Sequence, residues 1–324
     1  MTMSPRDPLS RRGFLAAAGL AAGAAALSRA GETAAPAAPP APAAPWRCRI
    51  GVSTYAMFQF RHDAWRDPVR CLDLAAELGF DGLELLRRQL PALDRSYLLG
   101  LKREAYARGL PLMGYSTHQD FVDPDPAVRE RNIAETELQL QEAAWLGIPA
   151  IRVNTGRWDT SGSFDALMAR QGVEDPLPGH TDEEAFGWVI AAFQRLVRKA
   201  EETGVELALE NHWGLARRVE GLLRILDAVP SPWLKATLDT GNFLEDDRYD
   251  QMERMAARTA LVQAKTYFGG GRWYTLDIDY ARVASILRAA GYRGYISLEF
   301  EGNAPVRDGL RESLALLRKH FGGG

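Results

Sequence analysis

The chain has 324 residues but few cysteines, few histidines and no excess of basic residues. Two cysteines, Cys48 and Cys71, are too few for a disulfide scaffold, although they could pair with each other or stay as buried thiols. The formal net charge of -3 disfavours nucleic acid or an anionic membrane surface as the main partner, because both favour a basic stripe. Five histidines also disfavour a multi-metal endonuclease site.

The amino-terminal 30 residues lack an apolar run long enough to span a membrane comfortably, which takes about 20 residues. Arg11 and Arg12 precede Phe14-Leu15 and an Ala- and Gly-rich run that ends at Leu27. This segment resembles a twin-arginine export signal, and Ser28-Arg29-Ala30 suits cleavage after Ala30. A disordered leader with a chance arginine pair is the alternative. We predict a signal over 1–30 and a periplasmic or otherwise exported mature protein without a membrane anchor.

The folded part of the chain is predicted to be one domain. Residues 31–46 are almost all Ala and Pro, which predicts an extended linker. From residue 47 to 324, short apolar runs alternate with longer amphipathic ones, which indicates parallel strands joined by helices. Eight such units favour a (β/α)₈ TIM barrel over a doubly wound Rossmann-like sheet, and the first strand lacks the G-x-G-x-x-G loop of the latter. The predicted strands are 50–54, 80–85, 110–117, 150–154, 205–210, 234–239, 261–265 and 295–299.

Polar side chains stand near the ends of the last four predicted strands. These are Glu210, Asp239, Gln263 and Glu299. Since the carboxyl ends of barrel strands share one face, the four are expected to converge there. Buried acids need a cation, and three carboxylates with an amide oxygen suit a divalent metal such as Mn²⁺, Mg²⁺, Co²⁺ or Zn²⁺. The alternative is a structural network in which the acids pair with Lys265, Arg152 or Arg217.

Four short segments resemble the xylose-isomerase-like barrel superfamily of sugar isomerases and epimerases. They are Leu-Glu-Asn-His at 209–212, Leu-Asp-Thr-Gly-Asn at 238–242, Val-Gln-Ala-Lys at 262–265 and Ser-Leu-Glu-Phe at 297–300. The resemblance implies that Glu210, Asp239 and Glu299 are metal ligands. The family commonly has histidine at the position of Gln263, and the glutamine has a parallel in hydroxypyruvate-isomerase-like members.

The resemblance also implies catalytic roles for Glu210 and Glu299, which would exchange a proton with the carbon next to a carbonyl. A metal that bridges the carbonyl and a neighbouring hydroxyl oxygen lowers the pKa of the carbon acid and stabilises an enediolate. One carboxylate then removes the proton and another group returns it. Return to the opposite face gives epimerisation, and return to a different carbon gives isomerisation.

Further residues are candidates for contact with a sugar substrate. His118 and His212 follow the third and fifth strands, although a histidine that caps the next loop is an equal alternative for His212. Asn242 stands three residues after Asp239, where members of the family often have a substrate-contacting histidine. Lys265 could orient substrate oxygens, but neutralising the acids is the simpler role. The loops after four strands carry Trp65, Trp158, Trp213 and Trp273, all expected at the site rim, where aromatic rings suit a sugar.

The preferred function is a divalent-metal-dependent isomerase or epimerase of an unphosphorylated sugar or keto-sugar, since phosphorylated sugars are mainly cytoplasmic. A lyase or dehydratase that acts on a keto-sugar, keto-inositol or 3-keto-glycoside shares the same proton abstraction, and the sequence does not separate the two. A non-catalytic exported sugar-binding barrel is a third alternative. Assembly of several copies of the chain stays open.

Overall fold

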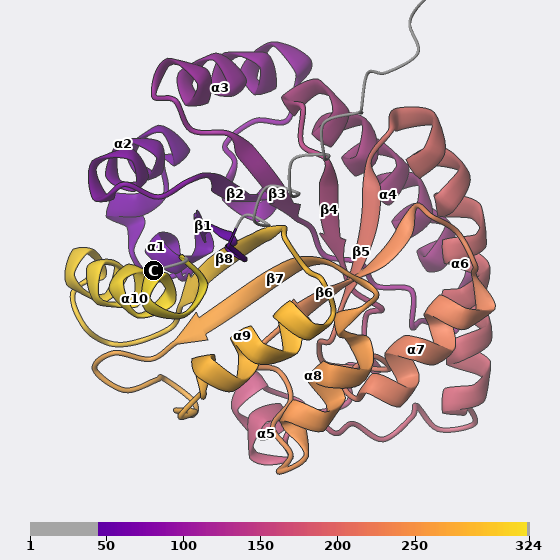
Figure 1. Ribbon diagram of the computed structural model, residues 1–324. Helices are drawn as coiled ribbons and strands as arrows, with labels where there is room; N and C mark the ends of the chain where they lie inside the picture. The colour runs from indigo at the N-terminus through magenta and orange to yellow at the C-terminus, as the bar shows by residue number, and fades with distance from the viewer. Residues whose placement is uncertain (1–44, 323–324) are drawn as a thin grey trace, which may run out of the picture. The chain divides into compact units, whose positions relative to one another are not determined.

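The computed structural model describes residues 45–322, so the signal predicted at 1–30 and nearly all of the linker predicted at 31–46 lie outside the described residues. Eight parallel strands close into a barrel in sequence order (Figure 1). This confirms the predicted (β/α)₈ fold. The strands are β1 Arg49–Ser53, β2 Leu83–Leu86, β3 Leu112–Ser116, β4 Ala150–Val153, β5 Glu206–Glu210, β6 Leu234–Asp239, β7 Thr259–Thr266 and β8 Tyr295–Phe300.

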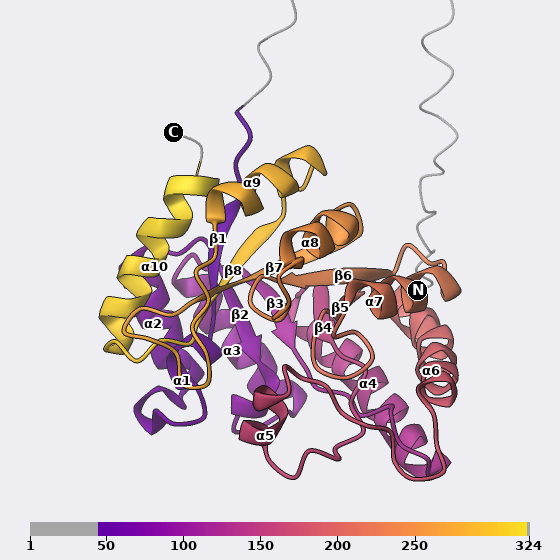
Figure 2. The same ribbon diagram turned by 90° about the horizontal axis from the view of Figure 1, so that it is seen from below.

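Helices surround the strands in both ribbon views (Figures 1 and 2). They are α1 Tyr55–Phe58, α2 Pro68–Leu78, α3 Arg95–Ala107, α4 Pro126–Leu146, α5 Phe164–Ala169, α6 Asp182–Thr203, α7 Val219–Ala228, α8 Arg248–Ala256, α9 Tyr280–Ala289 and α10 Val306–Phe321. Two short 3₁₀ turns, Asp63–Trp65 and Arg87–Gln89, follow β1 and β2. No helix within residues 45–322 is both long and apolar enough to cross a bilayer.

Local sequence signals explain where several helices begin and end. Thr181 and Glu184 form a reciprocal capping box at the start of α6, which satisfies two backbone N–H groups that the helix itself leaves free. Glycines in the left-handed conformation end α4 and α6, at Gly147 (φ 76°) and Gly204 (φ 68°). The strand predicted at 80–85 begins only at Leu83. In the turn before it, the Asp81 carboxylate accepts a hydrogen bond from the backbone N–H of Ile50 (2.8 Å).

The core lies between the barrel wall and the helices. Leucine, valine, isoleucine and alanine side chains of the strands are almost all buried, as a parallel sheet covered by helices requires. Cys48 and Cys71 are both free and buried, so the disulfide alternative is wrong. Burial raises the pKa of the Cys48 thiol to about 11 and that of the Cys71 thiol to about 12, which leaves both protonated.

Candidate active site

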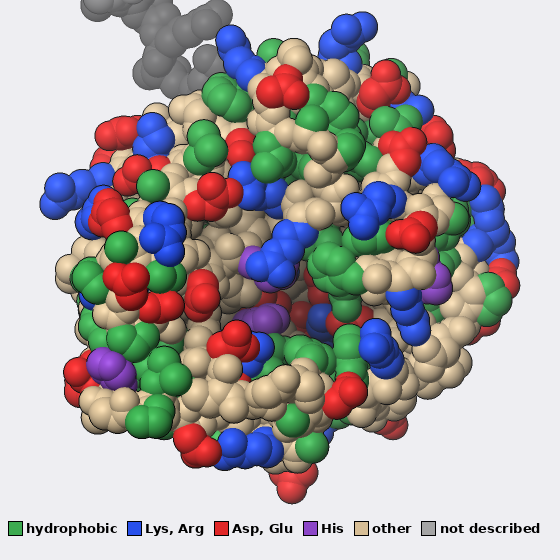
Figure 3. Space-filling view, turned by 180° about the vertical axis from the view of Figure 1, so that it is seen from behind, with side chains coloured by type: hydrophobic (Ala, Val, Ile, Leu, Met, Phe, Trp, Pro, Cys, Tyr) green, Lys and Arg blue, Asp and Glu red, His purple; other side chains and the backbone are tan. Residues whose placement is uncertain are grey.

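A pocket of about 340 Å³ opens at the carboxyl ends of the strands. The face shown in Figure 3 is hollowed, and acidic, basic and histidine side chains gather in the hollow. Seven of the nine predicted site residues line the pocket: His118, Glu210, His212, Trp213, Asn242, Lys265 and Glu299. The other two, Asp239 and Gln263, are fully buried and do not line it.

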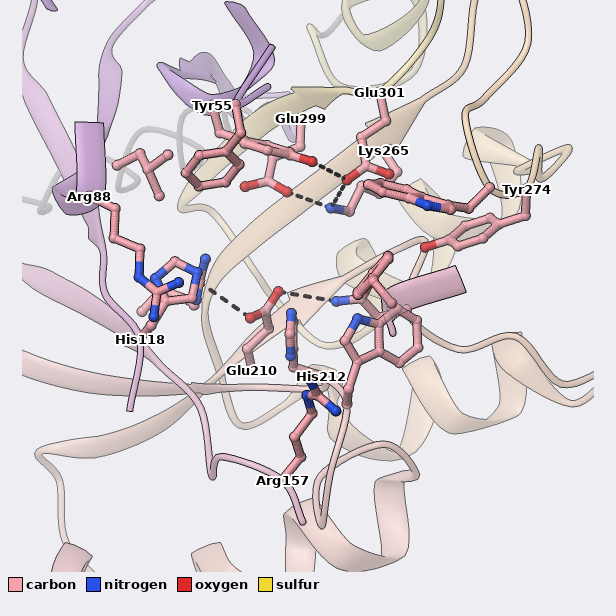
Figure 4. Close-up of a pocket in the computed structure, with 17 residues that line it drawn as sticks. Tyr55, Arg88, His118, Arg157, Glu210, His212, Lys265, Tyr274, Glu299 and Glu301 are labelled. Carbon is pink, nitrogen blue, oxygen red and sulfur yellow. Dashed lines mark hydrogen bonds and ion pairs between the residues drawn. The ribbon is translucent and has the colours of Figure 1, made fainter. Parts of the chain in front are cut away.

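Glu210 ends β5 and is 2% exposed. Its Oε1 accepts a hydrogen bond from Nδ2 of Asn242 (3.1 Å), and its Oε2 lies 3.3 Å from Nε of Arg152 (Figure 4). Burial, partly offset by the Arg152 guanidinium, raises the pKa of Glu210 to about 7. Asn242 therefore touches a predicted catalytic carboxylate as well as the pocket. Arg217, offered as another partner for the acids, pairs with Glu245 instead.

Asp239 ends β6 and is held by its own neighbours in the chain. Its Oδ1 accepts a hydrogen bond from the backbone N–H of Gly241 (2.7 Å). Asn211 fixes its backbone from both sides: Oδ1 accepts from the N–H of Asp239 (2.7 Å) and Nδ2 donates to its carbonyl (2.9 Å). Asn211 is thus a positioning residue inside the Glu-Asn-His segment. The sequence did not assign it a role.

Lys265 forms ion pairs with the buried acids. Its Nζ lies 2.6 Å from Oε2 of Glu299, 2.8 Å from Oε1 of Glu301 and 3.4 Å from Oδ2 of Asp239 (Figure 4). Burial alone would lower the pKa of Lys265, but Asp239 and Glu299 outweigh it and raise that pKa well above its usual value. A Cβ at Gly241 would lie 2.5 Å from Cγ of Lys265, so this approach requires glycine.

Gln263 belongs to a polar layer inside the barrel. Its Nε2 donates to Oε1 of Glu299 (3.0 Å) and to Oε1 of Glu84 (2.8 Å). Glu84, on β2, also accepts hydrogen bonds from the hydroxyls of Ser116 and Ser297. Burial, followed by repulsion from Glu299, raises the pKa of Glu84. Glu84 was not predicted as a site residue from the sequence. A single acid within the otherwise apolar strand Leu83–Leu86 could have indicated a buried polar contact.

The interior carries more acids than cations. Five carboxyl groups lie in or next to this network: Glu84, Glu210, Asp239, Glu299 and Glu301. Among residues 45–322, only Arg152 and Lys265 bring positive charge into contact with them. Burial also raises the pKa of Asp239 well above its usual value, as expected for uncompensated negative charge. A further cation would offset this imbalance.

The donor chemistry of the predicted ligands fits such a cation. Oε2 of Glu210, Oδ2 of Asp239 and Oε1 of Gln263 are buried and accept no hydrogen bond from the described residues. Carboxylate and amide oxygens are ligands for hard or borderline divalent metals. No three His, Cys, Asp or Glu side chains within 45–322 are arranged as a ligand cluster in this structure, and Lys265 is in contact with Glu299. A divalent cation would therefore take over part of the charge compensation that Lys265 provides.

Two histidines line the pocket as neutral imidazoles. Burial, reinforced by the Arg152 charge, lowers the pKa of His118 and of His212. A neutral imidazole offers one N–H donor and one acceptor nitrogen, which suits hydrogen bonds to hydroxyl groups. Nδ1 of His118 is buried without a hydrogen-bond partner among the described residues.

Aromatic side chains stand at the mouth of the pocket, but not all of those that were predicted. Trp213 and Trp273 line it. Trp65 and Trp158 do not, so their placement at this rim was wrong: Trp158 packs against Trp188 and donates a hydrogen bond to Asp182 instead. The other aromatic residues that line the pocket were not predicted from the sequence. They come from loops and short helices: Tyr55, Phe60, Phe164 and Tyr274.

Comparison with known proteins places this barrel in a family. The model of the family described as xylose isomerase-like TIM barrel matches residues 72–320. The chain belongs to this family. The sequence resemblance is thereby confirmed at the level of the family.

Solved structures with this fold include several sugar epimerases. The 3-keto-D-glucoside 4-epimerase of E. coli superposes with a TM-score of 0.65 at 20% identity, over 84% of this chain and all of the other. The D-psicose 3-epimerase of Clostridium cellulolyticum H10 superposes with a TM-score of 0.67 at 17% identity, over 84% of this chain and 99% of the other. An L-ribulose 3-epimerase superposes with a TM-score of 0.62 at 22% identity, over 84% of this chain and 91% of the other. At such identities the likeness is one of fold.

Replacing Lys265 with methionine tests the charge balance of this xylose isomerase-like barrel. In the presence of a chelator, Lys265→Met leaves Asp239 and Glu299 without their ammonium partner, so the free energy of unfolding is expected to fall by about 3–5 kcal/mol. Urea denaturation measures it. Lys235→Met, at a half-buried position on β6, is the control and should change stability by roughly 0.5 kcal/mol or less. Equal losses in the two variants would show that the ammonium is not the counter-charge.

Proposed function

We propose that the protein is a divalent-metal-dependent sugar isomerase or epimerase that moves a proton at the carbon next to a carbonyl of an unphosphorylated sugar or keto-sugar. The observation that carries this proposal is that two buried glutamates, Glu210 on β5 and Glu299 on β8, line the same pocket. The sugar epimerases among the solved structures of the same fold support it.

The two glutamates have different hydrogen-bond partners, and this difference suits them to different roles in proton transfer. Glu299 is held from two sides, by Lys265 Nζ and by Gln263 Nε2. Glu210 keeps Oε2 free of hydrogen bonds, next to Arg152. In the proposed reaction one carboxylate accepts the proton of the carbon acid and the other group returns a proton, and the second transfer decides the stereochemistry or position of the product.

Other pocket residues position the sugar. His118 and His212 present neutral imidazoles to hydroxyl groups, and Asn242 links the pocket wall to Glu210. Glu210, Asp239, Gln263 and Glu299 are the residues that would hold the metal. When bound, a divalent cation supplies Lewis-acid polarisation of a substrate carbonyl.

Solvent-exchange measurements test the proton transfer. The protein loaded with Mn²⁺ is incubated in D₂O with ketoses and 3-keto-glycosides, and NMR follows deuterium at the carbon next to the carbonyl. Glu210→Gln and Glu299→Gln should each slow incorporation by about 10²–10⁴-fold, because the amide cannot exchange a proton in the required step.

The matched control is Glu206→Gln, at the opposite end of β5, which should exchange as fast as the parent protein. Full exchange in both active-site variants would overturn the proposed role of the glutamates. The product identifies the reaction: an epimer or isomer supports the proposal, an eliminated group makes the protein a lyase, and sugar binding without exchange makes it a non-catalytic barrel.

Metal binding is tested independently of turnover. Isothermal titration with Mn²⁺ after chelation should give one site per chain, and Asp239→Asn should weaken it at least about tenfold, since a charged ligand is lost. Asp246→Asn, an exposed acid after β6, should leave the titration unchanged. Equal affinities in the two variants would mean that the cation binds elsewhere.

Export is part of the same proposal, because it would separate the enzyme from phosphorylated sugars. Its support is the arginine pair and the apolar run within residues 1–30. Changing both Arg11 and Arg12 to lysine should retain the protein inside cells of a host with a twin-arginine pathway, as seen by fractionation and immunoblotting. Unaltered export of the double variant would show that this pair is not read as a signal.

A further inference from the structure

A second cavity of about 360 Å³ lies beside the catalytic pocket. We call it the lateral cavity. Five residues line both spaces and therefore stand at their junction: Arg88, His118, Arg157, His212 and Trp213. Figure 4 shows Arg88 beside His118, and Arg157 near His212, on the side of Glu210 away from Lys265. A ligand that extends beyond the catalytic pocket in this direction enters the lateral cavity.

The lateral cavity has a wall of its own that takes no part in the acid network. Asp120, Asn154 and Asp159 line it and do not line the catalytic pocket. Asp120 and Asp159 are exposed carboxylates, and Asn154 is buried. Arg157 pairs with both Asp159 and Glu174. The cavity thus presents charges of both signs together with an amide.

This mixture selects against two kinds of ligand. A phosphate or carboxylate group would face the like charges of Asp120 and Asp159, which both line the cavity. An apolar group would remove water from these charges without replacing its hydrogen bonds, which is costly. A ring that carries several hydroxyl groups avoids both problems, because each hydroxyl can donate to a carboxylate and accept from a guanidinium.

The junction is also equipped for hydroxyl groups. His118 brings a buried Nδ1 without a partner among the described residues, and its imidazole is neutral. Arg88 is exposed and belongs to none of the ion pairs formed among residues 45–322. Trp213 adds part of an aromatic ring system to both cavities. Aromatic surface next to hydrogen-bonding groups suits the alternately apolar and polar faces of a sugar ring.

We propose that the lateral cavity is a glycosyl subsite, so that the substrate is a keto-sugar with a second sugar ring attached rather than a free monosaccharide. The inference rests on the proposed function for the position of the reacting ring, next to Glu210 and Glu299. The second ring lies against Asp120, Asn154 and Arg157, and Arg88 and His118 contact the link between the rings.

Asp120→Trp introduces a large side chain at a residue that lines the lateral cavity and does not line the catalytic pocket. Asp120 is exposed, and the hydrogen bond from its backbone N–H to Asn132 (3.0 Å) does not depend on its side chain. The matched control is Glu253→Trp, an exposed acid on α8 that lines neither cavity. Deuterium exchange is compared for D-fructose and for the 3-keto derivatives of maltose, cellobiose, trehalose and sucrose.

The expected result is a preference of the parent protein for at least one keto-disaccharide. Asp120→Trp should raise KM for that substrate at least about tenfold, which corresponds to the loss of about one hydrogen bond to a charged group, and leave KM for D-fructose unchanged. Glu253→Trp should leave both unchanged. A parallel rise for mono- and disaccharide, or no rise for either, would overturn the subsite.

A binding measurement separates this inference from the proposed activity. Saturation-transfer NMR with the unoxidised disaccharides and with glucose needs no turnover. Contact through both rings in the parent protein, reduced to one ring in Asp120→Trp, supports the subsite even when no proton exchange is found and the proposed function fails. Contact through one ring alone for every disaccharide contradicts the subsite even when exchange is rapid.

Discussion

The acids buried inside the barrel set the constraint on which the rest of the site depends. A carboxylate removed from water must be paired, hydrogen-bonded or protonated. Glu84 is satisfied by hydrogen bonds from Ser116, Ser297 and Gln263, whereas Glu299 depends on the Lys265 ammonium. The strand interior gives up apolar packing at these positions, so the arrangement is explained by chemistry at the pocket rather than by stability.

The same constraint explains details that look unrelated in the sequence. Gly241 lacks a side chain because the stem of Lys265 passes through the space that a Cβ would take. Asn211 holds the backbone of Asp239 at both its N–H and its carbonyl, which keeps the carboxylate at the end of β6 in place. Supporting contacts of this kind let a polar site persist inside a packed barrel.

Much of this site could be predicted from the sequence, because strand ends in a parallel barrel share one face. That single rule brought Glu210, Lys265 and Glu299 to one pocket. It could not show that Glu84 reaches Gln263 from the other side of the barrel, since their contact depends on how the sheet closes. The rule also could not predict which aromatic side chains of the loops line the pocket. Trp158 packs against Trp188, whereas Phe164 packs against Trp273 at the pocket mouth.

Two sets of charged residues lie in different parts of the barrel. Strands β5 to β8 carry Glu210, Asp239, Lys265 and Glu299, to which β2 adds Glu84. In the proposed function, Glu210 and Glu299 transfer protons and Lys265 compensates negative charge. Segments that follow β2, β3 and β4 carry Arg88, Asp120 and Arg157, which line the lateral cavity and bear no part of that network. The two sets meet at His118 and His212, where neutral imidazoles separate the Arg88 and Arg157 guanidinium groups from Glu210 (Figure 4). The two arginines also act on these imidazoles: burial and the Arg152 charge lower both histidine pKa values, and Arg88 adds to the effect at His118 and Arg157 at His212. A change of charge in the β2–β4 loops would therefore be felt at the imidazoles that face the sugar in the proposed function, so substrate choice and the protonation of the pocket are coupled through this junction.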